Sequence, residues 1–289
     1  MILVTGATGK VGSEAVRLLA ARHHPTRALV RDPSRVPRNG DGGTEGSVEI
    51  VTGDFNRPDT LDAAMRGIDT VVLVSPAVPA QEIAVIDSAV RQGVTHVIKV
   101  TSKASADSPV GRRRGQAQIE AHLETVGETA GLAYTLLRSN AYMQNLLALA
   151  PMIRQTGGFL MSAGDGQVGM IDARDVAATA AIIAAAPKEH AGQTYWLTGP
   201  SLITYADIAM ELYGTLGHLV EYRRISPEDH RAAMIQAGVP EAVATSNAQA
   251  FALIAEGDAA WLSDDVKSIT GSEPRSLRTF LADHVAAFR

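Results

Sequence analysis

Short apolar runs, most of them rich in β-branched residues, recur along the first half of the chain and alternate with stretches of helical periodicity. After the first run, apolar side chains return at Val11, Ala15, Leu18 and Leu19, which share one face of a helix. Such alternation is typical of a parallel sheet with helices on both faces, so the sequence predicts a doubly wound α/β fold. The expected strands are residues 1–4, 28–30, 48–51, 70–74, 96–100 and 134–137.

The second half of the chain is predicted to be mainly helical. Thr204 with Asp207, and Ser226 with Asp229, are capping patterns that mark two helix starts, and the alanine-rich residues 177–186 predict a closely packed helix. Residues 193–198 are expected to return as a strand to the sheet. We therefore predict a sheet domain over residues 1–150 and a smaller helical region over residues 151–289, packed across the carboxyl ends of the strands.

Glycines at three-residue intervals separate the first strand from the first helix. Gly6 can adopt the dihedral angles of a tight turn, Gly9 lets main-chain N–H groups approach a phosphate, and Gly12 lets the helix pack against the strand. The helix N-terminus then presents unsatisfied N–H groups to an anion. The pattern predicts the pyrophosphate-binding turn of a Rossmann fold. A nucleoside triphosphatase loop is excluded, because Lys10 is followed by Val11 where such a loop has Ser or Thr.

Polar residues follow the next strands at the edge where ligands bind in such folds. Arg31 closes the second strand, where an arginine meets a 2′-phosphate and an acid meets a ribose 2′-hydroxyl, so it favours NADPH over NADH. Asp32 is the alternative, since a shift of one residue would place a carboxylate there, although it also suits a turn. Asp54 can accept from an adenine amino group or serve a turn. Ser75 and Thr101 are expected farther along the crevice.

Composition narrows the class of protein. With 289 residues, 46% of them hydrophobic and 20% charged, the chain is long enough for one such domain and an appended region. A formal net charge of −5 argues against a nucleic-acid partner, and the absence of cysteine excludes disulfides and thiolate chemistry. We expect a cytoplasmic protein with no membrane segment and no metal site. The basic residues 112–114 are expected in a solvated loop or, alternatively, a flap facing a phosphate or a partner. The glycine-rich residues 39–46 are expected in a mobile surface loop.

None of the six tyrosines has a lysine four residues later, so the chain lacks the proton donor that short-chain dehydrogenases use. The consequence depends on the substrate. A simple ketone that receives hydride becomes a strongly basic alkoxide and needs a positioned acid. A quinone becomes a phenolate, whose conjugate acid has a pKa of about 10, and a cationic dye is neutralised. Such acceptors need cofactor positioning and little acid catalysis.

Together these segments resemble the NmrA-like atypical short-chain dehydrogenases over nearly the full length, and among them the NADPH-dependent quinone oxidoreductases and triphenylmethane-dye reductases. The resemblance is carried by residues 4–12 (VTGATGKVG), 29–33 (LVRDP), 53–55 (GDF), 134–138 (YTLLR), 172–177 (DARDVA) and 195–200 (YWLTGP). It implies a cofactor site that includes the residues of the glycine turn and of the strand ends discussed above. The predicted cofactor residues are Gly6, Thr8, Gly9, Lys10, Val11, Gly12, Arg31, Asp54, Phe55, Ser75 and Thr101.

The same resemblance implies that Tyr142 and Asn145 line the substrate pocket, with ordinary packing as the alternative. Gln116 departs from the family, which often has a histidine or lysine there, while Glu120 matches the family acid. Gln116 can hydrogen-bond a carbonyl but cannot deliver a proton. The sequence leaves open whether Glu120, Lys103 or a water supplies one.

Three hypotheses follow from these residues. The first is an NADPH-dependent oxidoreductase that transfers hydride to a quinone-like, conjugated, electron-poor acceptor. The second is an NADP(H)-sensing regulator without turnover that docks a protein partner. The third is a biosynthetic tailoring reductase for one metabolite. Tyr142 and Asn145 favour an enzyme, and a homodimer is compatible with each hypothesis.

Overall fold

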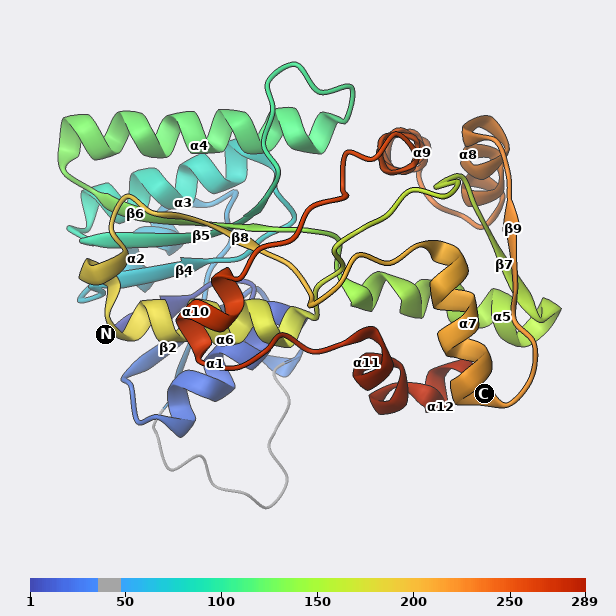
Figure 1. Ribbon diagram of the computed structural model, residues 1–289. Helices are drawn as coiled ribbons and strands as arrows, with labels where there is room; N and C mark the ends of the chain where they lie inside the picture. Colours follow the sequence, from blue (N-terminus) through green and yellow to red (C-terminus); the bar gives the residue numbers. More distant parts are fainter. Residues whose placement is uncertain (36–47) are drawn as a thin grey trace.

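The computed structural model describes residues 1–35 and 48–289, and its central feature is a seven-stranded parallel sheet (Figure 1). The strand order is β3-β2-β1-β4-β5-β6-β8, with every neighbouring pair parallel. The strands are β1 (Ile2–Val4), β2 (Thr26–Val30), β3 (Val48–Thr52), β4 (Thr70–Leu73), β5 (His96–Ser102), β6 (Ala133–Ser139) and β8 (Thr194–Leu197). The predicted doubly wound fold is confirmed.

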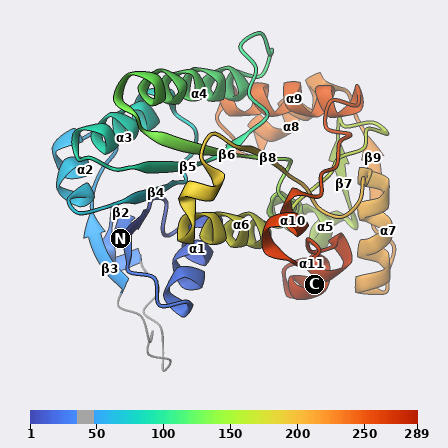
Figure 2. The ribbon, with the colours of Figure 1, turned by 60° about the vertical axis from the view of Figure 1, so that its left-hand side comes forward.

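Helices cover both faces of this sheet (Figure 2). Alternate residues of each strand face opposite layers, so Val4 packs under α1 (Lys10–Ala21) and α6 (Ala173–Ala185), whereas Leu3 packs on the other face. That other face carries α2 (Pro58–Met65), α3 (Pro79–Arg91) and α4 (Gly111–Ala130). Because both sides of the strands are buried, apolar residues run continuously along them.

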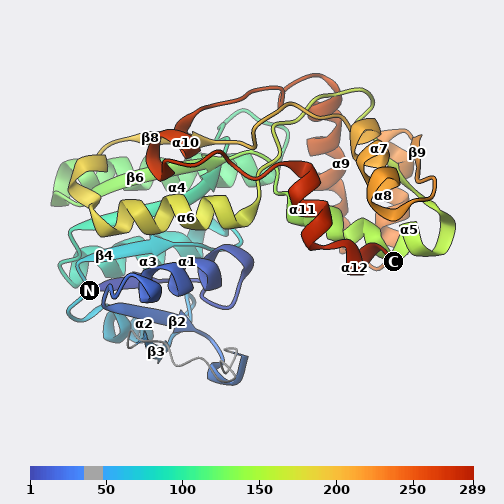
Figure 3. The ribbon, with the colours of Figure 1, turned by 60° about the horizontal axis from the view of Figure 1, so that its bottom comes forward.

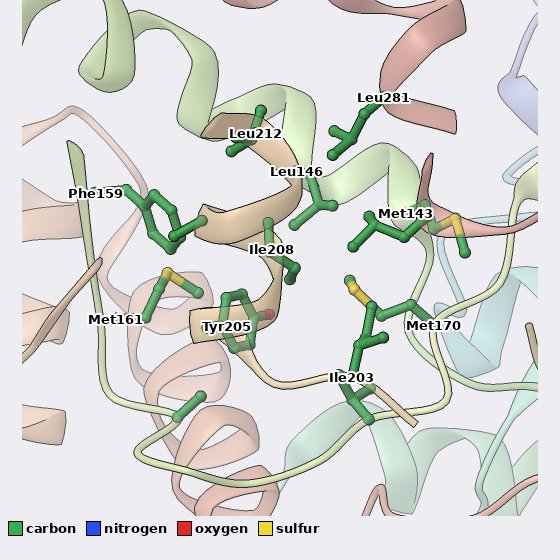
Figure 4. Packing of buried hydrophobic residues seen from close by; sticks show 14 of the residues in the cluster. Met143, Leu146, Phe159, Met161, Met170, Ile203, Tyr205, Ile208, Leu212 and Leu281 are labelled. Atoms are coloured by element: carbon green, nitrogen blue, oxygen red, sulfur yellow. The ribbon is translucent and has the colours of Figure 1, made fainter. Parts of the chain in front are cut away.

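A second, smaller part lies beyond the carboxyl ends of the strands (Figure 3). Its elements are η2 (Met143–Leu149), α5 (Ala150–Thr156), β7 (Gly158–Met161), α7 (Tyr205–Leu216), β9 (Glu221–Arg224), α8 (Pro227–Gln236), α9 (Glu241–Ala255), α11 (Leu277–Asp283) and α12 (Val285–Phe288). Figure 4 shows its core, in which Phe159, Tyr205 and Met161 meet beside Leu212 and Ile208. The parallel pair β7–β9 is a feature that the sequence did not predict.

The predicted division places residues 1–150 in the sheet domain and residues 151–289 in the smaller part. In the structure the chain crosses between the two parts more often than this division implies. Helix α6 packs on α1, and α10 (Asp265–Thr270) packs on α6 and β8, so both belong with the sheet. Strand β8 returns to the sheet beside β6, as predicted. Two short 3-10 turns, η1 (Pro33–Arg35) and η3 (Pro187–His190), complete the described elements.

The structure confirms the two helix starts that the capping patterns predict, and it contradicts the prediction for the basic run 112–114. Thr204 and Asp207 form a full capping box at α7, and the Ser226 hydroxyl accepts from the Asp229 N–H at α8. The predicted loop at residues 112–114 is wrong, because these residues form the first turn of α4. The buried Val110 anchors that start, and the Arg114 guanidinium donates to the Ser108 carbonyl at 2.6 Å. Residues 39–46 lie outside the described part of the chain.

Across the ranges 1–35 and 48–289, no helix is long and apolar enough to cross a membrane.

Candidate functional site

The glycine turn between β1 and α1 is shaped so that only glycine fits. Gly6 has φ +58°, and a Cβ there would lie 2.7 Å from the Val74 carbonyl oxygen. A Cβ on Gly12 would lie 2.3 Å from the Gly6 carbonyl oxygen. Helix α1 begins with Gly9 as its N-cap, has no side-chain cap and has no acid in its first turn. Its first N–H groups therefore have no intrahelical acceptor and are available to an anion.

A cavity of about 450 Å³ runs from this turn across the carboxyl ends of β2, β3 and β4. It brings together most of the predicted cofactor residues. Those that line it are Gly6, Thr8, Gly9, Arg31, Asp54, Phe55 and Ser75, with Val30, Gly53, Asn56, Val74, Pro76 and Gln81 among their neighbours.

The remaining predicted cofactor residues lie outside this lining. Val11 and Gly12 are buried in the first turn of α1. Lys10 extends toward the smaller part of the molecule, where its ammonium donates to the Gln144 carbonyl at 3.2 Å. Thr101, near the end of β5, is buried, and its hydroxyl donates to Glu120 of α4 at 3.0 Å. This hydrogen bond links β5 to α4.

At the rim of the cavity the two candidates for the ribose position have different surroundings. Asp32 is engaged in the turn that follows β2, since its Oδ1 accepts from the N–H and the hydroxyl of Ser34 at 2.9 and 2.7 Å. Arg31 is exposed, lines the cavity, and makes no ion pair with any residue in the described part of the chain. Asp54 also serves a turn, because its Oδ1 accepts from the Asn56 N–H at 2.9 Å.

A buried ion pair supports the cavity edge at the end of β4. The Ser75 hydroxyl donates to Glu82 of α3 at 2.5 Å, and the other Glu82 oxygen lies 2.9 Å from the Lys99 ammonium of β5. Both charged side chains are fully buried. Burial lowers the pKa of Lys99, and Glu82 and Glu120 counter that effect. The signal in the sequence is a lysine inside the apolar strand, a feature that the sequence reasoning did not use.

Two buried polar atoms, the Ser102 Oγ at the end of β5 and the Gln116 Oε1 on α4, have no hydrogen-bond partner within the described residues. One helical turn beyond Gln116, Glu120 is paired with the Arg138 guanidinium, which stacks over Trp196 at 5.0 Å from the ring centre. Glu120 is thus committed to Thr101 and Arg138. Gln116 is buried and retains a free carbonyl oxygen.

Tyr142 and Asn145, the two predicted pocket residues, face different surroundings. The Tyr142 hydroxyl lies 3.0 Å from the Ser139 Oγ, and burial raises the pKa of its phenol despite that hydrogen bond. Asn145 lines a second cavity of about 460 Å³ between η2, β7, α8 and α9. Sequence reasoning missed this cavity and its residue His230, and it considered Arg112 only as part of the basic run 112–114. Only the helix-start pattern before His230 was visible, and it carries no information about a pocket.

The basic run and the candidate proton donor Lys103 are linked to the C-terminal segment. Asp258 accepts from the Lys103 ammonium and from the Arg113 guanidinium, each at 2.6 Å. Lys103 is therefore an ion-pairing residue that fastens the segment after α9 to the end of β5.

A doubly wound sheet whose first strand leads through this glycine turn into a helix is the architecture of a dinucleotide-binding protein. A model of the NmrA-like family matches residues 1–280, and the chain belongs to that family, which confirms the predicted resemblance.

Several of the similar proteins are reductases or oxidoreductases by name. The NAD(P)H azoreductase of Xenophilus azovorans is 38% identical over 294 residues, which cover 100% of this chain and 99% of the relative. The NADPH-dependent quinone oxidoreductase of Escherichia coli complexed with NADPH superposes with a TM-score of 0.86 at 27% identity, covering 99% of this chain and 100% of the other. The triphenylmethane reductase of Citrobacter sp. complexed with NADP(H) gives 0.83 at 26%, covering 98% and 99%.

Proposed function

We propose that this protein is an NADPH-dependent oxidoreductase that transfers hydride to a quinone-like or other conjugated, electron-poor acceptor. The observation that carries the proposal is the glycine-turn cavity with Arg31 at its rim, where the guanidinium has no ion-pair partner among the described residues. The names of the similar azoreductase, quinone oxidoreductase and triphenylmethane reductase support both the cofactor and the class of acceptor.

The residues present fit this cofactor. The turn from Gly6 to Gly9 leaves no room for a Cβ at Gly6 and offers the free N–H groups of α1 to a pyrophosphate. Arg31 suits the 2′-phosphate, because a guanidinium pairs with phosphate in a bidentate manner. Asp54 and Phe55 would hold the adenine end. The Gln116 Oε1, which has no partner among the described residues, lies outside the lining of this cavity.

When bound, the reduced nicotinamide supplies the hydride, and this chain's residues position it and the acceptor. Gln116 is not an acid, and Tyr142 keeps its proton because burial raises its pKa. Glu120 and Lys103 are occupied in ion pairs. The site therefore suits acceptors that yield weakly basic or neutral products.

The experiment is turnover by the purified protein with NADPH and a panel of benzoquinones, naphthoquinones and cationic dyes, followed by the loss of reduced-cofactor absorbance. We expect turnover with several members of the panel and little with simple ketones. Binding of NADPH by calorimetry without turnover of any acceptor would contradict the enzyme proposal and favour the sensing regulator. Turnover restricted to one dedicated metabolite would instead favour a tailoring reductase.

A further inference from the structure

The second cavity is mainly apolar and has at its opening a cation, Arg112, with no ion-pair partner among the described residues. Its volume of about 460 Å³ is that of a small-molecule site. Most of its lining is apolar and flexible, from Leu146, Met152, Met161, Met234, Phe251 and Ile254. Such a lining accommodates a planar aromatic body, because methionine side chains adapt to irregular shapes and pack well on rings.

The polar groups of the cavity are few, and among the described residues that line it Arg112 alone is charged at neutral pH. His230 is held by a hydrogen bond of 2.9 Å between its Nδ1 and the Ser162 Oγ, and its ring packs 4.9 Å from Phe251. Burial lowers the pKa of His230, so its imidazole is neutral near pH 7. Asn145 and Asn247 complete the polar lining.

Arg112 differs from its two neighbours in the basic run. Arg113 is paired with Asp258, and Arg114 donates to backbone carbonyls at the helix start, so both have structural partners. Arg112 has no hydrogen bond or ion pair with any residue in the ranges 1–35 and 48–289. It is exposed while it lines the cavity, which places it at the opening.

This placement is unfavourable for the protein alone. A cation in the first turn of α4 is repelled by the positive end of the helix dipole and by Arg113. An anionic group bound at the opening would offset the repulsion from the helix dipole and from Arg113. It would also give Arg112 a charge partner at the opening of an otherwise apolar cavity.

We propose, building on the proposed function, that this cavity is the acceptor pocket and that it selects aromatic acceptors carrying an anionic substituent, which Arg112 binds at the opening. The aromatic body occupies the apolar lining, and the carboxylate or sulfonate remains near solvent on the guanidinium. Arg112 is thus a specificity-determining residue.

The test uses a matched pair of acceptors: a methylnaphthoquinone that bears a propanoate side chain, and its methyl ester. The ring and its reducibility are the same, and only the charge differs. For Arg112→Gln we expect KM for the acid to rise about tenfold while KM for the ester changes less than about twofold, because one charge-assisted contact is lost. Arg112→Lys should give an intermediate value, since lysine keeps the charge and loses the bidentate geometry.

The control is Arg22→Gln at the exposed end of α1, which removes the same charge away from the cavity and should change neither KM. Equal effects of Arg112→Gln on acid and ester, or an effect on neither, would overturn the proposal. Circular dichroism and the ester activity report whether the variant is folded.

A second readout separates this inference from the proposed function. Naphthalene-2-sulfonate and naphthalene-2-sulfonamide cannot accept hydride, and their binding is measured by calorimetry. We expect wild-type protein to bind the sulfonate more tightly, and Arg112→Gln to abolish the preference. If that preference is found and depends on Arg112 while no quinone is reduced, the anion pocket stands and the proposed function fails. If quinones are reduced and the preference is absent, the anion pocket fails alone.

Discussion

Arg31 is the residue that we propose to select NADPH over NADH. It follows β2 at the rim of the cavity, and its charge has no partner in the described ranges. The neighbouring Asp32 is engaged with Ser34 and shapes the turn. At this scale, the different contacts of these two neighbouring side chains support the proposed role of Arg31.

We predict that Arg31→Gln raises the dissociation constant of NADPH about tenfold or more and leaves that of NADH within about twofold. A charged hydrogen bond contributes roughly 1.5–3 kcal/mol, and about 1.4 kcal/mol corresponds to tenfold in affinity. Fluorescence titration with both cofactors measures the effect. The matched control is Asp32→Asn, which should weaken the turn without changing the ratio of the two affinities. An equal loss for NADH would refute the assignment of Arg31 to the 2′-phosphate.

At the scale of elements, the contact of α3 with β5 depends on the buried pair of Glu82 and Lys99. A buried pair adds little net stability when intact, but losing one partner leaves an uncompensated charge. Because Ser75 donates to Glu82, this pair also holds the end of β4 at the cofactor cavity.

We predict that Glu82→Gln lowers the free energy of unfolding by about 3–5 kcal/mol, since Lys99 then has no charge partner in a fully buried place. The double variant Glu82→Leu with Lys99→Met should recover most of that loss, and water in the cavity can then bond Ser75. Urea denaturation of both variants checks this. A double variant as unstable as the single one would show that packing, and not the unpaired charge, causes the effect.

The elements themselves were predictable to different degrees. The strands of the large sheet are continuous apolar runs, so a local pattern identifies them. Strands β7 and β9 were not predicted, because each has only four residues and the sequence of β9, Glu-Tyr-Arg-Arg, is polar and mostly exposed. Their pairing of Gly158 with Glu221 joins distant parts of the chain, and no local pattern encodes it.

At the scale of the whole molecule, buried histidines in both parts make stability depend on pH. His96 is the first residue of β5, with its Nε2 2.8 Å from the Thr135 hydroxyl of β6, and burial followed by the nearby His190 lowers its pKa from 6.5 to about 4. His230 in the smaller part has its pKa lowered by burial as well. Below about pH 6.5, these histidines therefore bind protons in the unfolded chain but remain neutral in the folded protein.

We predict that stability falls as the pH is lowered from about 6.5 to about 4, with His96 contributing up to about 3 kcal/mol of the loss. Urea denaturation at about pH 7 and about pH 5 measures the slope. His96→Gln should flatten it, whereas substitution of the exposed His218 by Gln should leave it as in the wild type. An unchanged slope in His96→Gln would mean that His96 is charged in the folded protein.

The sequence by itself determined the doubly wound half and the turn that receives a dinucleotide. Both are encoded in consecutive residues: apolar runs for the strands, and Gly6, Gly9 and Gly12 for a turn where a Cβ does not fit or is crowded. Only the tertiary structure revealed the second cavity, which we propose as the acceptor pocket. Arg112 and His230 come from α4 and α8, and they meet at one cavity because α8 and α9 pack beside η2 and β7. Such long-range packing has no period along the chain, so no local pattern could reveal it.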